Sequence, residues 1–170
     1  NEALINYQKA IYSYEYVNYK YGIAYTWKDL GLIYQQKGDY EKGMEYLEKS
    51  YVLFKEIGDF SGMADLLNIM GLTYNISENN LEKALEYYEK ANDIYQQLGQ
   101  LRGFAAVKSN CASVYYDRGE FEKALRIFEE VYELDKKHGD PLYIGTSLRN
   151  IAKVNQKMGD IKMALENLKE

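Results

Sequence analysis

The chain has 170 residues, of which 46% are hydrophobic and 28% are charged, and its formal net charge is -5. This length and composition are typical of a folded chain with a sizeable core, and they exclude a disordered or collagen-like protein. No apolar run reaches the ~20 residues of a membrane-spanning helix, so we expect no membrane insertion. The acidic balance argues against general binding of nucleic acid. The single cysteine excludes an internal disulfide and a cysteine-based zinc site.

Small residues recur along the chain at a nearly constant interval. One set is spaced by 40, 41 and 40 residues and comprises Gly31, Gly71, Ala112 and Ala152. A second set has the same period and comprises Ala3, Gly43, Ala84, Ala124 and Ala164. Self-similarity at a fixed period of about 20–50 residues is the signature of a repeat architecture. In chain order we predict the second helix of an incomplete leading repeat over 1–20, repeats over 21–60, 61–101 and 102–141, and an incomplete repeat over 142–170.

Within each repeat, apolar residues follow offsets of 3, 4 and 7, which indicate amphipathic helices rather than strands. We predict about nine helices, each of about 14–18 residues and joined by tight turns. The turns are marked by glycine, which is replaced by asparagine at Asn18 and Asn79; asparagine also accepts the left-handed conformation. The residues expected to cap helix N-termini are Asp39, Asp59, Asn80, Asp140 and Asp160, with Glu120 as a weaker member. On the charged outer face we expect the pairs Glu45–Lys49, Glu86–Lys90 and Glu122–Arg126.

Two residue counts fit this interpretation. The only proline, Pro141, falls at a predicted helix start, where its missing N–H has no helical partner. Many of the nineteen tyrosines fall on repeat positions, such as the set Tyr34, Tyr74 and Tyr115. We expect these rings to pack inside the array with their hydroxyl groups at its wetter edge.

The helices carry a known family pattern. The first-helix motif is Trp27-x-x-Leu30-Gly31-x-x-Tyr34, and the second-helix motif is Ala84, Tyr88 and Ala91. Over the whole chain these motifs resemble the tetratricopeptide repeat (TPR) family. The period is similar to that of the long-repeat subtype of Pins/LGN, rapsyn and many bacterial TPR regulators. The resemblance implies an all-α fold, a right-handed α-solenoid of antiparallel helix hairpins known as the TPR superhelix.

The chain begins and ends inside predicted second helices. We interpret it as a segment of a longer array or of a larger protein. The alternative is that residues 1–20 and 158–170 themselves act as end caps, which an array needs for solubility.

We expect no catalysis, no metal site and no cofactor. The only histidine, His138, lies beside the turn residue Gly139 and has no second histidine to form a metal site with. Cys111 occupies a helix-packing position, which predicts a buried small hydrophobic residue rather than a nucleophile. The glycines do not form a phosphate-binding loop.

The resemblance implies that the first helix of each repeat lines a concave groove that binds a peptide or protein segment. The candidate groove residues at the family's positions are Tyr25, Lys28, Asp29, Leu32, Asn68, Leu72, Ile76, Asn110, Tyr116, Arg149, Asn150, Lys153 and Lys157.

Two features of this set suggest the chemistry of a partner. Asn110 and Asn150 are primary amides, which can bracket a peptide bond because they donate and accept together; a tolerated polar residue on a helix is the alternative. Arg149, Lys153 and Lys157 form a basic stripe at i, i+4 and i+8. With apolar residues elsewhere in the groove, this stripe suggests a partner with apolar and acidic parts. A solvated basic face, or contact with a further repeat, explains the stripe equally well.

The leading hypothesis is therefore a non-catalytic protein-interaction module. Two alternatives are a sensor or regulatory segment of a signalling protein, such as a kinase or transcription regulator, and self-assembly through exposed end helices. The scarcity of cysteine and the lack of a signal-peptide pattern in residues 1–20 favour a cytoplasmic location.

Overall fold

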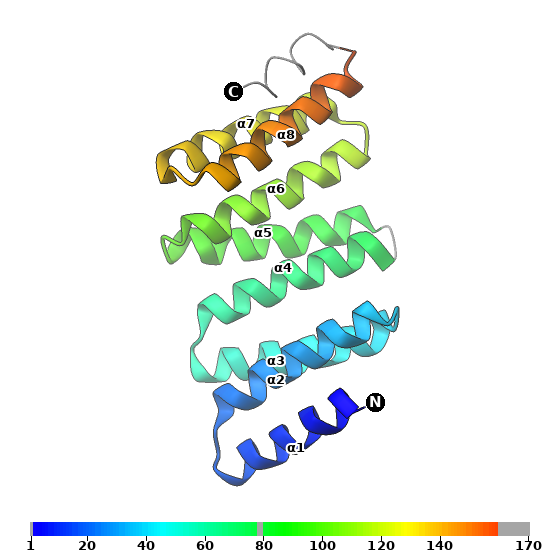
Figure 1. The fold of residues 1–170 in the computed structure, drawn as a ribbon, viewed down its shortest axis with the longest axis vertical. Coiled ribbons are helices and arrows are strands. Elements are labelled where there is room, and N and C mark those ends of the chain that lie inside the picture. The colour runs from blue at the N-terminus through cyan, green and yellow to red at the C-terminus, as the bar shows by residue number, and fades with distance from the viewer. Residues whose placement is uncertain (1, 78–79, 160–170) are drawn as a thin grey trace. The chain divides into compact units, whose positions relative to one another are not determined.

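The computed structural model describes residues 2–77 and 80–159. These residues form eight α-helices and no strand (Figure 1). The helices are α1 Glu2–Tyr16, α2 Lys20–Gln36, α3 Tyr40–Ile57, α4 Phe60–Ser77, α5 Leu81–Gln97, α6 Leu101–Asp117, α7 Phe121–His138 and α8 Pro141–Lys157. The predicted all-α helical repeat is confirmed. The ninth expected helix belongs to residues 160–170, which lie outside the described residues.

The chain divides into two compact units, Asn1–Ile94 and Tyr95–Glu170. The boundary falls inside α5, within the predicted repeat 61–101. In each unit, successive helices run antiparallel and pack against each other, as α2 and α3 do in the first unit and α6 and α7 in the second (Figure 1). Among the described residues, no helix combines the length and the apolar character needed to cross a membrane.

Left-handed residues reverse the chain between helices, as predicted. Gly58, with a φ of 77°, ends α3, and Asn18, with a φ of 52°, takes the corresponding place after α1. Asn18 is the only non-glycine residue with positive φ in the described part of the chain. Asparagine tolerates this conformation better than other side chains. The second predicted asparagine, Asn79, lies outside the described residues.

Side-chain caps begin several helices where the sequence predicts them. The carboxylate of Asp39 accepts a hydrogen bond from the Lys42 amide at 3.2 Å, and Asp140 accepts one from the Leu142 amide at 3.0 Å. Asp59 and Asn80 cap α4 and α5 in the same way. Glu120 makes no side-chain cap bond, as expected of the weaker member, and Asp160 lies outside the described residues.

Small residues allow neighbouring helices to approach closely in the first unit. A Cβ added to Gly31 would lie 2.8 Å from the Leu47 side chain, and one added to Gly71 would lie 2.6 Å from the Tyr88 ring. Phe54 is fully buried in the core of this unit, and Trp27 packs against that core. The glycines therefore set the spacing between helices, because a larger residue would displace buried side chains.

Tyrosines pair across two hairpins, α2–α3 and α4–α5. Tyr34 stacks on Tyr46 with ring centroids 5.5 Å apart, and Tyr74 stacks on Tyr87 at 5.3 Å. A lysine covers each pair, with Lys83 Nζ 3.9 Å from the centroid of Tyr74. Cation–π contacts of this kind stabilise ring pairs at an exposed edge.

The charged outer face forms two of its three predicted ion pairs. Lys49 contacts Glu45 and Lys90 contacts Glu86, each at 2.5 Å. The hydrogen bond from each lysine, and then its charge, lower the pKa of both glutamates. Glu122 and Arg126 are both described, and they do not form the third predicted pair.

Candidate functional site

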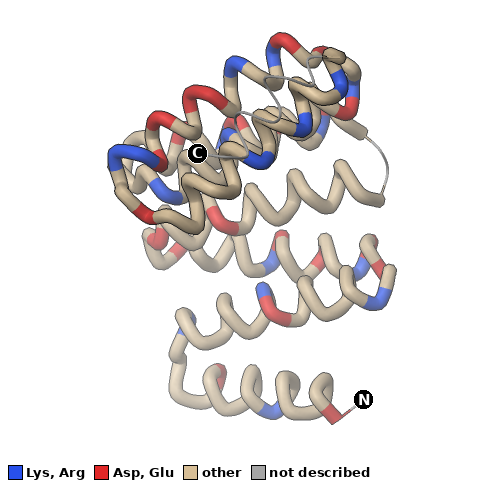
Figure 2. The backbone as a smooth tube through the Cα atoms, turned by 45° about the horizontal axis from the view of Figure 1, so that its top comes forward, with Lys and Arg blue, Asp and Glu red and all other residues tan. Residues whose placement is uncertain are grey.

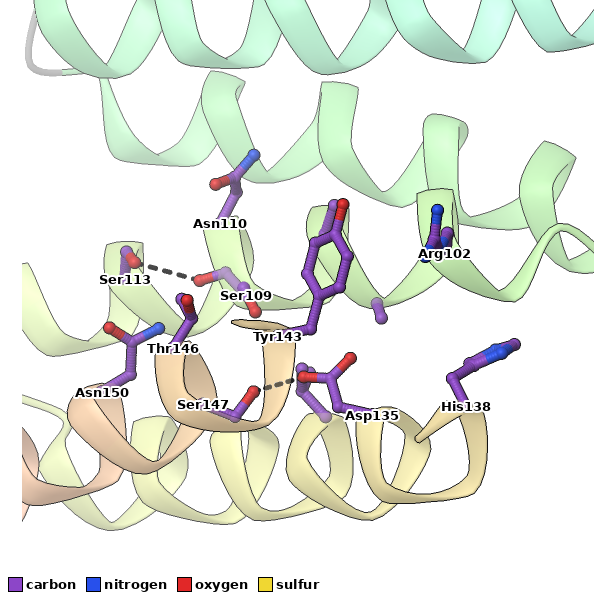
Figure 3. Close-up of a pocket in the computed structure, with 13 residues that line it drawn as sticks. Arg102, Ser109, Asn110, Ser113, Asp135, His138, Tyr143, Thr146, Ser147 and Asn150 are labelled. Atoms are coloured by element: carbon purple, nitrogen blue, oxygen red, sulfur yellow. Dashed lines mark hydrogen bonds between the residues drawn. The ribbon is translucent and has the colours of Figure 1, made fainter. Parts of the chain in front are cut away.

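Helices α6, α7 and α8 of the second unit surround a pocket of about 320 Å³, shown in Figure 3. Its polar side chains come from one stripe of α6, one stripe of α8 and the last turns of α7. We call it the Asp135 pocket, and its polar lining comprises Arg102, Ser109, Asn110, Ser113, Asp135, His138, Tyr143, Thr146, Ser147 and Asn150. Ala105, Ala106 and Val131 complete the lining.

A buried carboxylate lies at the base of this pocket. Asp135 is only 7% exposed, and its Oδ2 accepts a hydrogen bond from Ser147 Oγ at 2.5 Å (Figure 3). This bond joins the end of α7 to the second turn of α8. A buried carboxylate that is hydrogen-bonded but has no cation partner is costly, since water no longer solvates its charge.

Arg102 carries the opposite charge beside this pocket, and that charge already has a partner. Arg102 forms an ion pair with Asp140 at 3.0 Å and lies over the Tyr143 ring, 5.1 Å from its centroid. Both Arg102 and Tyr143 are exposed. Arg102 therefore lines the pocket while its charge is paired with Asp140 and not with Asp135.

A second, smaller pocket adjoins the first. It holds about 210 Å³ and shares Ser113 and Asn150 with the Asp135 pocket. We call it the Lys153 pocket, because Lys153 extends it on α8; Tyr116, Asp117 and Phe128 complete its lining. The Tyr116 ring is held edge-on by Phe121, with centroids 5.5 Å apart. Together the two pockets follow the space between α6 and α8.

The structure brings together four of the predicted groove residues here. Asn110 and Asn150 line the Asp135 pocket, and Asn150, Tyr116 and Lys153 line the Lys153 pocket. Arg149 and Lys157 are exposed on α8 and line neither pocket.

The predicted residues of the first unit line neither of these pockets. Tyr25 stacks on Tyr21 and meets Phe54 edge-on at 5.0 Å, while Lys28 Nζ lies 4.5 Å above its ring. Partial burial, and then the nearby charge of Asp59, raise the pKa of the Tyr25 phenol. Ile76 is exposed. The half-buried members are Asp29, Leu32, Asn68 and Leu72.

Sequence reasoning missed most residues of the Asp135 pocket, including Arg102, Asp135, Tyr143 and Ser147. A signal for Asp135 was present in the repeat itself. It stands 40 residues after Tyr95, which stands 41 after Phe54, so an acid replaces an aromatic ring at a repeat position.

The comparisons with known proteins fit this architecture. The family model described as soluble NSF attachment protein, SNAP, matches residues 1–138. The chain belongs to the SNAP family. The match to the SNAP model ends with α7, so it covers Asp135 but not Tyr143 or Ser147. No curated protein sequence matches this SNAP-family chain.

Solved structures show the fold of the SNAP-family chain. BtubC (BKLC) from P. vanneervenii is 20% identical with a TM-score of 0.84, over 99% of this chain and 70% of BtubC. The apo form of RapI is 19% identical with a TM-score of 0.83, over 97% of this chain and 60% of RapI. A putative kinesin light chain with TPR-like repeats from Podosopora anserina is 18% identical with a TM-score of 0.68, over 87% and 72%. The TPR-type helical repeat is thereby confirmed, whereas the long-repeat subtype stays a prediction.

Proposed function

We propose that the chain is a non-catalytic protein-interaction module that binds an extended segment of a partner between α6 and α8. The observation that carries this proposal is the pair of adjoining pockets that share Ser113 and Asn150. Pockets in series along one groove suit successive side chains of an extended peptide. The Asn150 amide lies where they meet, and it can donate to and accept from the peptide backbone between those side chains.

The distribution of charge supports α6 and α8, rather than the outer side of α7, as the binding surface. Helix α7 carries nine Asp, Glu, Lys or Arg residues, whereas α6 carries three (Figure 2). Interaction surfaces are depleted in charge at their centre, where desolvation is most costly. The sparsely charged stripe of α6 fits such a centre.

The family description supports protein binding. It names an attachment protein, and helical repeat arrays form extended concave surfaces that serve for binding. Cys111 is buried, and His138 is the only histidine in the sequence. Neither residue offers the paired nucleophile and base that a reaction would need. We propose a cytoplasmic location on the scarcity of cysteine; a sensor role and end-to-end self-association remain predictions.

Replacing Asn150 by alanine tests the groove. Peptides are first selected from a random library on the wild-type chain, and their affinities are then measured by fluorescence anisotropy. We expect Asn150→Ala to weaken the selected peptides about tenfold, because backbone hydrogen bonds are lost where the two pockets meet. The control Gln96→Ala removes an exposed amide from α5 and should leave affinity unchanged. Peptides that bind both variants like the wild type would exclude the groove.

Reversing the charge of the basic stripe tests whether the partner is acidic. We propose that an acidic side chain of the partner lies against Lys153, whose side chain is part of the lining of the Lys153 pocket. The double variant Arg149→Glu with Lys153→Glu should abolish anisotropy changes with acidic selected peptides, since two attractions become repulsions. Circular dichroism should show unchanged helicity, because both residues are exposed. Unaltered affinity for acidic peptides would refute this part of the proposal.

A further inference from the structure

One packing arrangement recurs at the junctions between repeats. An aromatic residue near the end of a second helix lies over a glycine at the start of the next first helix. The Phe54 ring lies 3.0 Å from the Cβ position of Gly62, and the Tyr95 ring fills the corresponding place at Gly103. Tyr14 lies over Gly22 in the same way. Phe54 and Tyr95 are both buried, so at these two junctions a ring fills the space beside the glycine.

The junction between α7 and α8 inverts this arrangement. One period after Tyr95 the chain has Asp135, and one period after Gly103 it has Tyr143. The aromatic ring has moved from the second helix to the next first helix, where it is exposed over Arg102. Ser147 likewise stands one period after the buried Val107. The place filled by a ring at other junctions is here open, and it is the Asp135 pocket.

The charge at the base of the pocket is not compensated by a described residue. One carboxylate oxygen of Asp135 accepts from Ser147, and within residues 2–77 and 80–159 no cation pairs with this carboxylate. The nearby Arg102 forms an ion pair with Asp140 instead. The C-terminus of α7, at His138, adds the negative end of its helix dipole. The base of the pocket therefore carries a carboxylate without a cation partner among the described residues, beside the apolar side chains of Ala105, Ala106 and Val131.

We propose that the Asp135 pocket is a subsite for a lysine or arginine side chain of the partner segment. The aliphatic stem takes the space of the missing ring, against Ala105, Val131 and the Tyr143 ring, and the cation pairs with Asp135. Long basic side chains bury their methylene groups in this way while their charge reaches a polar group. The subsite rests on the proposed groove and adds to it a basic residue beside the acidic one expected at Lys153.

The distance along α8 between the two subsites predicts how far apart the charged residues of the bound peptide lie. Ser147, which holds Asp135, and Lys153 are six residues apart in one helix, or about 9 Å at ~1.5 Å per residue. An extended peptide advances about 3.3 Å per residue. The basic and acidic side chains of the partner are thus separated by about three positions.

The subsite can be tested with a minimal probe. The full chain is labelled with ¹⁵N and titrated with N-acetyl-arginine N-methylamide, with the norleucine analogue as the uncharged comparison. We expect saturable shifts of the Asp135, Tyr143 and Ser147 amides with the arginine probe only. In Asp135→Asn, which preserves shape and a partner for Ser147, the dissociation constant should rise at least fivefold. Glu122→Gln, which removes an exposed carboxylate from the same helix, should have no effect.

A steric variant keeps the test decisive if Asp135→Asn does not fold. Ala106 is exposed at the pocket, so Ala106→Leu blocks it without entering the core, and the arginine probe should no longer bind. Equal binding of the norleucine probe, equal affinity in the variants, or no saturable shift would overturn the subsite.

The peptides selected for the groove separate the two proposals. Basic residues in these peptides, with affinity lost in Asp135→Asn, would support the subsite. The peptides could instead bind Asn150→Ala more weakly, lack basic residues and bind Asp135→Asn with the affinity of the wild type. That result would support the groove and refute the subsite. If the peptides bind Asn150→Ala with the affinity of the wild type, the groove itself is refuted.

Discussion

Replacing Gly71 by leucine is expected to lower the free energy of unfolding by about 3 kcal/mol, the upper end of the range for overpacked cores. Gly71 lies in α4 against α5, where even a Cβ would approach the Tyr88 ring to 2.6 Å and the Ala84 carbonyl oxygen to 3.1 Å. Tyr88 is fully buried and the carbonyl belongs to helical backbone, so neither can move without separating the helices. Urea unfolding followed by circular dichroism measures the loss.

Gly145 provides the matched control. It lies inside α8, is exposed, and an added Cβ would meet no atom within 4 Å. Glycine is less favourable than leucine in a helix interior, so Gly145→Leu should raise the free energy of unfolding by about 0.5 kcal/mol. Near wild-type stability of Gly71→Leu would show that α4 and α5 do not depend on close approach at this position.

Replacing Phe54 by alanine is expected to cost about 4 kcal/mol of stability, because a large buried ring leaves a cavity. Phe54 is fully buried on α3, and it joins three helices. Its ring meets Tyr25 of α2 edge-on at 5.0 Å and packs over Gly62 of α4. The same urea experiment gives the energy. In variants that still fold, NMR of labelled tyrosine should show a shifted and broadened Tyr25 ring.

An exposed phenylalanine six residues later provides the control. It distinguishes the effect of removing a buried ring from the effect of removing any phenylalanine. Phe60 begins α4 and is 54% exposed, so Phe60→Ala should change the free energy of unfolding by no more than about 0.5 kcal/mol. Equal losses in the two variants would mean that Phe54 stabilises the unit through something other than its burial.

The fold could be predicted because the same local rules are repeated. Each period repeats a left-handed turn residue, an N-cap and small packing residues, so an error in one repeat is corrected by the others. Asn18 shows this well, since only its place in the period identifies it as a left-handed turn residue. The missing Glu122–Arg126 pair shows the limit, because exposed ion pairs contribute too little energy to be fixed by spacing alone.

The site was predicted only in part, for a related reason. The family's groove positions identified Asn110 and Asn150, which face the Asp135 pocket from α6 and α8. They did not identify Asp135, because a residue on a second helix belongs to the core in the general pattern. Its role depends on a departure from the repeat combined with a change 8 residues later, at Tyr143. A departure of this kind has meaning only when the packing of both positions is known.

The exchange between Asp135 and Tyr143 shows how an array of near-identical hairpins can diversify. At Gly62 and at Gly103 a buried ring fills the space beside the glycine, and at the junction between α7 and α8 this space is open. On the proposal made above, moving that ring across the junction opens a subsite for a basic side chain within the same helical repeat. A recognition site can therefore be gained or erased, one junction at a time, by two substitutions in a scaffold that continues to fold.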